Sequence, residues 1–278
     1  MCSRSMRCEA VGRLLPALAA VVLAGCRLAS VPESEPRPFS IGLEALDPSG
    51  GHVQGIAAAP DALYVAQQTR IAKLDWQGRV LKTRAVPRHT GDLCWHGGFL
   101  YTALANDGKG FIQVYDSALN LVREKPLDRG IDGIAILDGV LYLGMGAARG
   151  QPSAKPHRVN ILGRFDACTL DEIAPRAEFD YGHDTKYGFQ NITTDGRRLY
   201  GTFYSVKGSP QVAVFDKSLR LERTHHLKAN QGLDALPKEL VGDRTLFIRA
   251  TTQRGDDGKI AGCAFDFWEP DKETARGT

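Results

Sequence analysis

Residues 56–75 read IAAAPDALYVAQQTRIAKLD and contain three short segments with the composition of β-strands. The first segment begins at Ile56 and ends at a Pro60-Asp61 turn. The second contains Leu63-Tyr64, and the third ends in Leu74-Asp75. Apolar runs that are bounded by Pro, Gly and Asp are typical of strands joined by tight turns. This stretch therefore predicts antiparallel strands of one sheet.

Two markers from this stretch recur five times along the chain. The first is a leucine followed by an aromatic residue, at Leu63-Tyr64, Leu100-Tyr101, Leu141-Tyr142, Leu199-Tyr200 and Leu246-Phe247. The second is a large apolar residue followed by aspartate, at Leu74-Asp75, Tyr115-Asp116, Phe165-Asp166, Phe215-Asp216 and Phe265-Asp266. The aspartates lie 41, 50, 50 and 50 residues apart, a period typical of a four-stranded β-propeller blade. We expect these aspartates to cap the turns that follow them, which is a structural role.

The two ends of the chain predict how the repeats assemble. The last repeat has no fourth strand after Trp268, whereas residues 39–43 form a strand that no repeat accounts for. We therefore expect an all-β, five-bladed β-propeller over residues 39–268, closed by this N-terminal strand, which completes the last blade. The predicted blades span about residues 50–86, 87–127, 128–179, 183–227 and 230–268 with 39–46. A β-sandwich is the alternative, but it leaves the five matching markers unexplained.

The composition fits a folded domain and disfavours nucleic acid as a partner. The 278 residues are 43% hydrophobic and 24% charged, with 30 glycines and 14 prolines, which is typical of a globular protein rich in turns. The formal net charge is +3. Three arginines and one glutamate in the first 25 residues supply +2 of it. The remaining body is nearly neutral and has no basic field that would attract phosphate backbones.

The N-terminus predicts export. A basic start precedes an apolar run that is too short to span a bilayer, as in a signal peptide. The tetrad Leu23-Ala24-Gly25-Cys26 resembles the lipobox of bacterial lipoprotein precursors, in which cleavage precedes a lipidated cysteine. The resemblance implies a signal peptide over 1–25, a lipid on Cys26, and a tether over 26–38 that lifts the domain off the membrane. An ordinary secretory signal is the alternative.

The residue after the cysteine bears on the location. In lipoproteins an aspartate there favours the inner membrane, so Arg27 implies the outer membrane, with the domain facing the periplasm. The predicted partners are therefore the membrane, through the lipid anchor, and either a small ligand or an envelope protein. The polar tail over 269–278 is expected to be disordered.

Three cysteines remain beyond the predicted lipidation site, namely Cys94, Cys168 and Cys263. They include no Cys-x-x-Cys spacing and indicate no zinc site. We expect all three to be core strand residues, and a disulfide between two of them is the alternative.

Polar residues recur in the segments that open the repeats. The innermost strands of a propeller begin at one mouth of the central tunnel, so the residues just before them converge there. The expected core residues of these strands are Ile56, Leu93, Ile134, Ile192 and Leu236. One or two places before them stand Gln54, Asp92, Asp132, Gln190, Asn191 and Asp234. His52 and His89 stand four places before the core residue in the first two repeats, and His183 lies in the loop that enters the fourth.

These side chains suggest a ligand on the axis. Facing carboxylates repel one another and favour a cation, a proton or a basic ligand between them. The candidate metal ligands are Asp92, Asp132, Asn191 and Asp234, an oxygen-rich set that suits calcium or magnesium. His52 or His89 would add an imidazole for a transition metal or for general-base work. In the alternative interpretation, the polar residues only hydrogen-bond the backbone of the neighbouring blade.

The same segments resemble a group of exported bacterial propellers of unassigned function. Their His-x-Gln-Gly, His-x-Gly-Asp-Leu, Gly-Ile-Asp-Gly and Tyr-Gly-x-Gln-Asn-apolar elements match residues 52–55, 89–93, 130–133 and 187–192 in that order. The resemblance covers about residues 50–195 and implies a shared inner surface, but no reaction. A weaker similarity extends to lactonase propellers of the gluconolactonase and paraoxonase type, which hold calcium in the tunnel but have six blades. The acidic and aromatic blade motifs of plant-type glutaminyl cyclases do not occur.

The sequence leaves three functions open. The first is a cell-envelope lipoprotein whose propeller binds a small ligand or a divalent cation at the tunnel mouth, as a binding or scaffold module. The second is a metal-dependent, lactonase-like hydrolase in which His89 or His52 moves a proton. The third is a platform for protein interactions on the outer blade faces. The serine elbow, the HExxH helix, the P-loop and the Rossmann fingerprint are absent from the sequence.

Overall fold

The computed structural model describes residues 36–42, 46, 51–87, 89–106, 108–147, 155–206 and 208–270. The predicted signal peptide, Cys26, most of the tether and residues 271–278 lie outside this part of the chain. Within it, no helix is both long enough and apolar enough to cross a bilayer.

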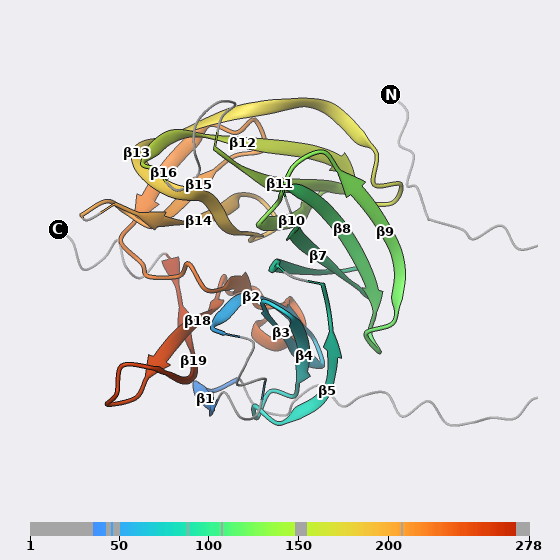
Figure 1. Cartoon of the computed structure of the whole chain (residues 1–278), viewed down its shortest axis with the longest axis vertical. Helices are drawn as coiled ribbons and strands as arrows, with labels where there is room; N and C mark the ends of the chain where they lie inside the picture. Colours follow the sequence, from blue (N-terminus) through green and yellow to red (C-terminus); the bar gives the residue numbers. More distant parts are fainter. Residues whose placement is uncertain are drawn as a thin grey trace, which may run out of the picture.

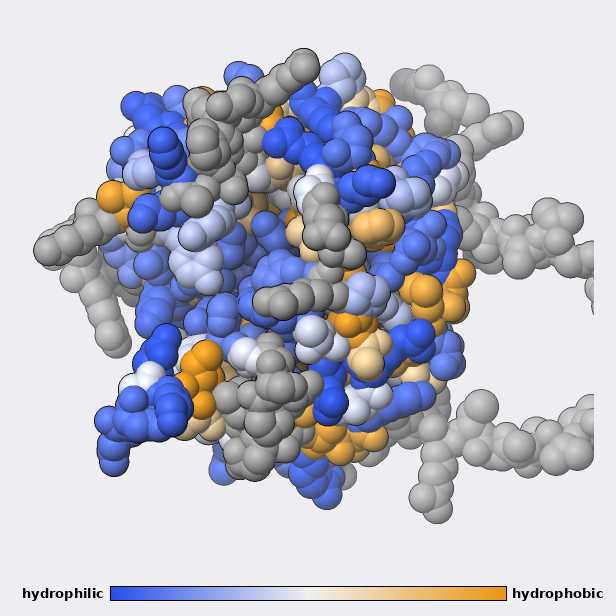
Figure 2. All heavy atoms as spheres, viewed as in Figure 1, coloured by the Kyte–Doolittle hydropathy of each residue, from blue (hydrophilic) through white to orange (hydrophobic). Residues whose placement is uncertain are grey.

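The chain folds almost entirely into antiparallel β-strands, which form four sheets. The first contains β2 (Val53–Ala59), β3 (Ala62–Gln67), β4 (Arg70–Leu74) and β5 (Val80–Ala85). The second contains β6 (Thr90–His96), β7 (Phe99–Asn106), β8 (Lys109–Asp116) and β9 (Leu121–Leu127). The sheets are arranged around a common centre (Figure 1), and the surface seen from the same direction is largely hydrophilic around that centre (Figure 2).

The third sheet has seven strands and joins two of the sequence repeats. Its members are β10 (Gly133–Leu137), β11 (Val140–Ala147), β12 (His157–Asp166), β13 (Glu172–Thr194), β14 (Leu199–Ser205), β15 (Val212–Phe215) and β16 (Leu221–His225). The long strand β13 pairs with β12 through its first part and with β14 through its last. The expected boundary between 128–179 and 183–227 therefore falls within one strand, which is irregular at this point: Gly182 has a φ of 79°, and the register with β12 shifts between Val159 and His157.

The N-terminal strand belongs to the same sheet as the C-terminal strands. This fourth sheet runs in the order β1 (Phe39–Gly42), β19 (Ile260–Trp268), β18 (Phe247–Arg254) and β17 (Leu233–Ala235), with the short α1 (Lys238–Val241) between β17 and β18. Phe39 lies opposite Phe265, and their rings stack at 4.9 Å. The pairing of the stretch 39–43 with the last repeat, predicted from the sequence, is thus present.

The leucine–aromatic marker has a packing explanation. In the first two sheets it lies in the second strand, where successive side chains point to opposite faces. Leu63 packs into a hydrophobic cluster with the β17–β19 sheet, whereas the next residue, Tyr64, packs into a cluster with the β6–β9 sheet. Leu100 and Tyr101 repeat this arrangement with the sheets on either side of them. Each marker therefore joins two neighbouring sheets, and its burial supplies much of the hydrophobic stabilisation.

The aspartates of the second marker cap turns, as expected. The Asp75 carboxylate accepts the backbone N–H groups of Gln77 and Arg79 at 3.0 and 2.9 Å. Asp116, Asp166 and Asp216 do the same two to four residues further along the chain. Asp266 differs, because no turn follows it in β19, and it pairs with Arg249 instead.

None of these three cysteines forms a disulfide within the described part of the chain. Cys263 is a buried residue of β19 and Cys94 a half-buried residue of β6, as predicted for strands. The expectation for Cys168 is wrong. It is exposed in the turn after β12, where its backbone N–H is bound by the capping carboxylate of Asp166.

Candidate functional site

The inner strands β2, β6, β10, β13 and β17 set the geometry of the axis. Each of these strands has one core residue, which is identified by the residue opposite it on the next strand of the chain. Ile56 pairs with Val65, two places beyond Leu63, and the same offset from the marker leucine holds for Leu93, Ile134 and Ile192. In the last repeat Leu233 pairs with Arg249, which lies two places beyond Phe247 instead of two beyond Leu246. We call the side on which these strands begin the start face, and the side on which they end the opposite face.

The residue directly before each core residue lies at the centre, where the inner strands approach one another. In three strands it is a glycine, and in the other two it is Asp92 or Asn191, both fully buried. A Cβ on Gly55 would lie 2.5 Å from the Cα of Asp92, and one on Gly133 would lie 2.7 Å from the side chain of Ile192. These glycines therefore allow the inner strands to approach closely around Asp92 and Asn191.

Asp92 joins three strands through its carboxylate. The backbone N–H groups of Ile134 and Ile192 donate to Oδ2 at 3.1 and 2.8 Å, and Asn191 Nδ2 donates to Oδ1 at 3.1 Å. The same Asn191 amide also donates to the carbonyl of Gln54 at 2.9 Å. Burial raises the pKa of Asp92 well above its usual range. The structure thus gives Asp92 and Asn191 the role that sequence analysis treated as the alternative, in which they bind the backbone of neighbouring sheets.

Asp132 is different from Asp92, although both stand at the start of an inner strand. Its backbone is held in place, since its N–H donates to Gly144 and its carbonyl accepts the N–H of Asp92 at 2.8 Å. Its side chain points toward the start face and is 27% exposed to solvent, and its Oδ1 lies 3.8 Å from Nε2 of His89. Burial raises the pKa of Asp132 to about 7. Among the residues that the structure describes, no backbone N–H binds this carboxylate.

Further polar and aromatic groups surround this pair. Tyr204, at the end of β14, lies within electrostatic range of Asp132, and its hydroxyl is hydrogen-bonded by the side chain of Asn230. Its ring meets that of Tyr187 edge-on at 5.8 Å. Tyr187 has a φ of 64°, a left-handed conformation that is costly for a side chain of this size. Such strain persists only where the surrounding structure imposes it.

The remaining predicted residues of the start face are placed as follows. Gln54 is buried, and its amide lies 3.1 Å from Nε2 of His52. Burial and, second, the charge of Arg254 lower the pKa of His52. Gln190 is half-buried at a position equivalent to that of Asp132. His183 packs edge-on against Tyr181 at 5.4 Å, and no contact among the described residues links it to Asp132.

Asp234 lies toward the opposite face, apart from Asp132. The strand that forms in the last repeat is Leu233–Ala235, and its core residue is Leu233 instead of the predicted Leu236. Asp234 therefore follows the core residue instead of preceding it. Its carboxylate accepts the N–H of Ala58 at 2.7 Å and the hydroxyl of Thr193. Burial raises its pKa to about 7.

The predicted calcium set is not assembled by this arrangement. Asp92 and Asp234 use their oxygen atoms on backbone and side-chain donors, and Asp132 faces a different side from Asp234. Across the described ranges, no group of three or more His, Cys, Asp and Glu side chains is placed to hold a metal ion. Calcium prefers six to eight oxygen ligands, so these residues do not fit it as a set.

The sequence did not single out Tyr204 and Asn230. Both stand outside the segments that open the inner strands, one at the end of β14 and one before β17. Only the tertiary structure brings Tyr204 near Asp132 and Asn230 to Tyr204. The signal that was available is weak: a second tyrosine, Tyr204, in the same strand as the marker Tyr200.

No protein-family model matches the chain, and no curated protein sequence does. Solved structures do match. The chain superposes on glutaminyl cyclase from Myxococcus xanthus with a TM-score of 0.56 and 11% identity, covering 84% of this chain and 95% of that one. It superposes on the GH43_1 enzyme from Xanthomonas citri complexed with xylose with a TM-score of 0.51 and 13% identity, covering 81% and 92%. These matches are β-propeller proteins, and the chain has a β-propeller fold.

Proposed function

We propose that this chain is a five-bladed β-propeller, closed by β1, that is held at the cell envelope by a lipid on Cys26. In this interpretation β13 serves as the outer strand of the third blade and the inner strand of the fourth. The pairing of β1 with β19 supports closure, because it places both ends of the folded chain in one sheet. The lipobox tetrad and its position after the apolar run support the anchor.

We further propose that the start face binds a small polar ligand at Asp132 and His89. The observation that carries the proposal is the contrast between two axial carboxyls. Asp92 is bound by backbone donors and holds the strands together, whereas Asp132 keeps its oxygens for another partner in a recessed position. A recessed polar group without such donors costs free energy unless something satisfies it. A ligand with an amine or hydroxyl groups would do so, and Tyr204 and Tyr187 add aromatic surface beside it.

Ligand-observed NMR on the full chain in detergent tests this proposal. The probes are xylose as a neutral sugar, ethanolamine as a primary amine and glutamine as an amide, each compared between wild type and Asp132→Asn. Asp171→Asn is the matched control, because Asp171 is exposed in the turn between β12 and β13, where it pairs with Lys125. We expect saturation transfer to at least one probe, lost in Asp132→Asn and retained in the control. Absence of transfer to all three, or transfer that survives Asp132→Asn, would overturn the proposal.

A second candidate is catalysis of proton transfer by the same pair. A carboxyl group whose pKa lies near neutrality, beside an imidazole at 3.8 Å, has the properties of a general acid or base. A panel of lactones and esters, assayed with wild type and Asp132→Asn, distinguishes turnover from binding alone. The third possibility, an interaction platform on the outer faces, would leave both assays negative.

A further inference from the structure

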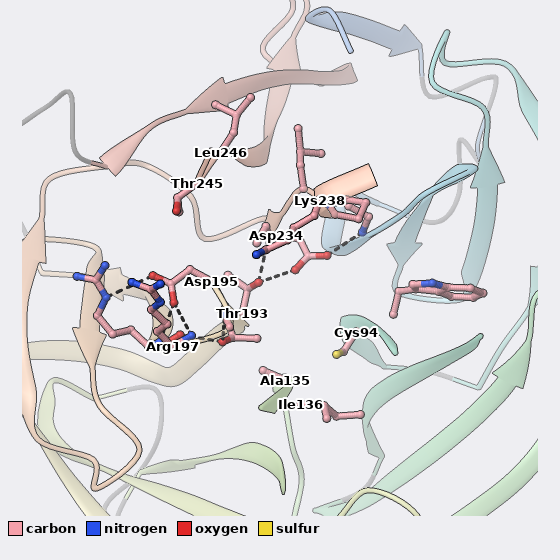
Figure 3. A pocket seen from close by; sticks show the side chains of 18 of the residues that line it. Cys94, Ala135, Ile136, Thr193, Asp195, Arg197, Asp234, Lys238, Thr245 and Leu246 are labelled. Carbon is pink, nitrogen blue, oxygen red and sulfur yellow. Dashed lines mark hydrogen bonds and ion pairs between the residues drawn. The ribbon is translucent and has the colours of Figure 1, made fainter. Parts of the chain in front are cut away.

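The opposite face contains a cavity that lies apart from Asp132 and His89. It has a volume of about 490 Å³ (Figure 3), which is within the range of small-ligand pockets. Its floor is made by the residues that follow the core residues of the inner strands, among them Cys94, Ala135, Thr193 and Asp234. Small side chains at most of these positions leave the hollow open.

The floor is polar and rigidly held. The hydroxyl of Thr193 donates to Asp234 and accepts the backbone N–H of Ala235 at 3.2 Å. The other carboxylate oxygen of Asp234 accepts the N–H of Ala58 at 2.7 Å. Each of these side-chain oxygens has a further lone pair for a hydroxyl group of a ligand. Figure 3 shows Asp234 and Thr193 side by side at the cavity.

Basic side chains stand on two walls of the cavity. Arg197 and Arg198 come from the turn between β13 and β14, and Lys238 and Arg244 come from α1 and the segment before β18. In the part of the chain that is described, the Arg197 side chain has no ion-pair partner, and Lys238 meets only Asp243, at 3.8 Å.

The acidic residues beside the cavity neutralise only part of this charge. Arg198 pairs with Asp195 at 3.3 Å and Arg244 lies 3.9 Å from Glu269, which leaves Arg197 and Lys238 as the least neutralised of the four. The carboxylate of Asp195 is almost fully buried and is used by its own hairpin, where it accepts the N–H groups of Arg197 and Arg198 and the hydroxyl of Tyr200. Asp243 is fully exposed to solvent. The cavity thus combines a hydrogen-bonding floor with cationic walls.

We propose that this cavity binds a small organic anion, a phosphate monoester or carboxylate whose remaining part carries hydroxyl groups. Its anionic group contacts the basic side chains of the walls, for which charge-assisted hydrogen bonds are suited. Its hydroxyl groups face Thr193 and Asp234. The site does not depend on the ligand proposed for the start face, because the two lie at opposite ends of the inner strands.

Isothermal titration calorimetry on the full chain tests the proposal with glucose 6-phosphate and galacturonate as probes. Glucose and inorganic phosphate are titrated separately, because they represent the neutral and the anionic part of glucose 6-phosphate. We expect at least one probe to bind about tenfold more tightly than glucose or inorganic phosphate does. The double variant Arg197→Ala/Lys238→Ala should bind that probe about tenfold more weakly than wild type. Both replaced side chains are exposed, so the fold is retained, which circular dichroism checks.

Lys259→Ala is the matched control, since Lys259 is an exposed lysine on the turn between β18 and β19 and does not line the cavity. Binding should be unchanged in this variant and in Asp132→Asn, which separates this site from the start face. Failure of both probes to bind, equal affinity for inorganic phosphate or for glucose, or affinity that survives the double variant would each overturn the proposal.

Discussion

Replacement of Asp92 by alanine should destabilise the protein more than any other single change at the start of an inner strand. The carboxylate is fully buried and accepts hydrogen bonds from two backbone N–H groups and one amide, contributed by two other strands. A buried donor that loses its acceptor costs about 1–3 kcal/mol, so three donors cost about 3–9 kcal/mol. Removal of a carboxyl that burial itself disfavours offsets part of this. We therefore expect a loss of about 3–5 kcal/mol.

Urea unfolding, followed by tryptophan fluorescence and circular dichroism, measures the change. The matched control is Asp132→Ala, which removes the same side chain from a similar place in the neighbouring strand. Because no backbone donor among the described residues binds that carboxylate, its removal should not lower the stability by more than about 1 kcal/mol. A loss below about 1 kcal/mol for Asp92→Ala, or equal losses for the two variants, would refute the assignment of Asp92 as the residue that joins the inner strands.

Four further perturbations have expected outcomes. The folded-state pKa of Asp132 is raised to about 7 from an unfolded value near 3.8, so the folded state binds more protons between these pH values and the stability should fall as the pH rises from 4 to 7. Thermal melts of Asp132→Asn should show a smaller decline over this range, and an unchanged decline would contradict a buried carboxyl at this position. Gly55→Ala places a Cβ 2.5 Å from the backbone of Asp92 and should therefore lower the midpoint of urea unfolding. A midpoint equal to that of wild type would show that the two strands are not in close contact. Phe39→Ala removes a ring stacked on Phe265 and should cost about 1–3 kcal/mol in the same assay; no loss would argue against a stable β1–β19 pairing. Cys26→Ser should move the protein from the membrane fraction to the soluble fraction and remove the lipid from the mature N-terminus in mass spectra, whereas a lipid-free wild type would contradict the lipobox assignment.

The propeller fold could be predicted because its signals are local. An alternating strand shows its pattern within six residues, and Leu63-Tyr64 carries in two consecutive positions the contacts with both neighbouring sheets. The capping of turns by Asp75 and its equivalents is equally local, since donor and acceptor lie within four residues. The prediction for Cys168 failed because a turn residue beside an apolar-Asp pair was taken for part of the strand.

The candidate site was predicted less completely, because it depends on register. In the last repeat the marker Leu246-Phe247 is one residue out of step with the others, since Phe247 takes the place of the leucine. The shift, together with the choice of Leu236 as the core residue, placed Asp234 at the wrong end of the inner strand. Asp132 and His89 were found because both stand directly before a strand whose start is well marked.

The sequence by itself determined the repeat, the strand content, the turn caps and the pairing of the first strand with the last repeat. These follow from side-chain alternation and from interactions between residues that are close in the chain. Only the tertiary structure decided which polar residue acts where. Asp92 binds the N–H of Ile192, 100 residues away, while Asp132 meets no such donor among the described residues. The reason is physical: whether a buried carboxylate is satisfied depends on backbone groups of other sheets, and their positions are set by packing around the whole axis.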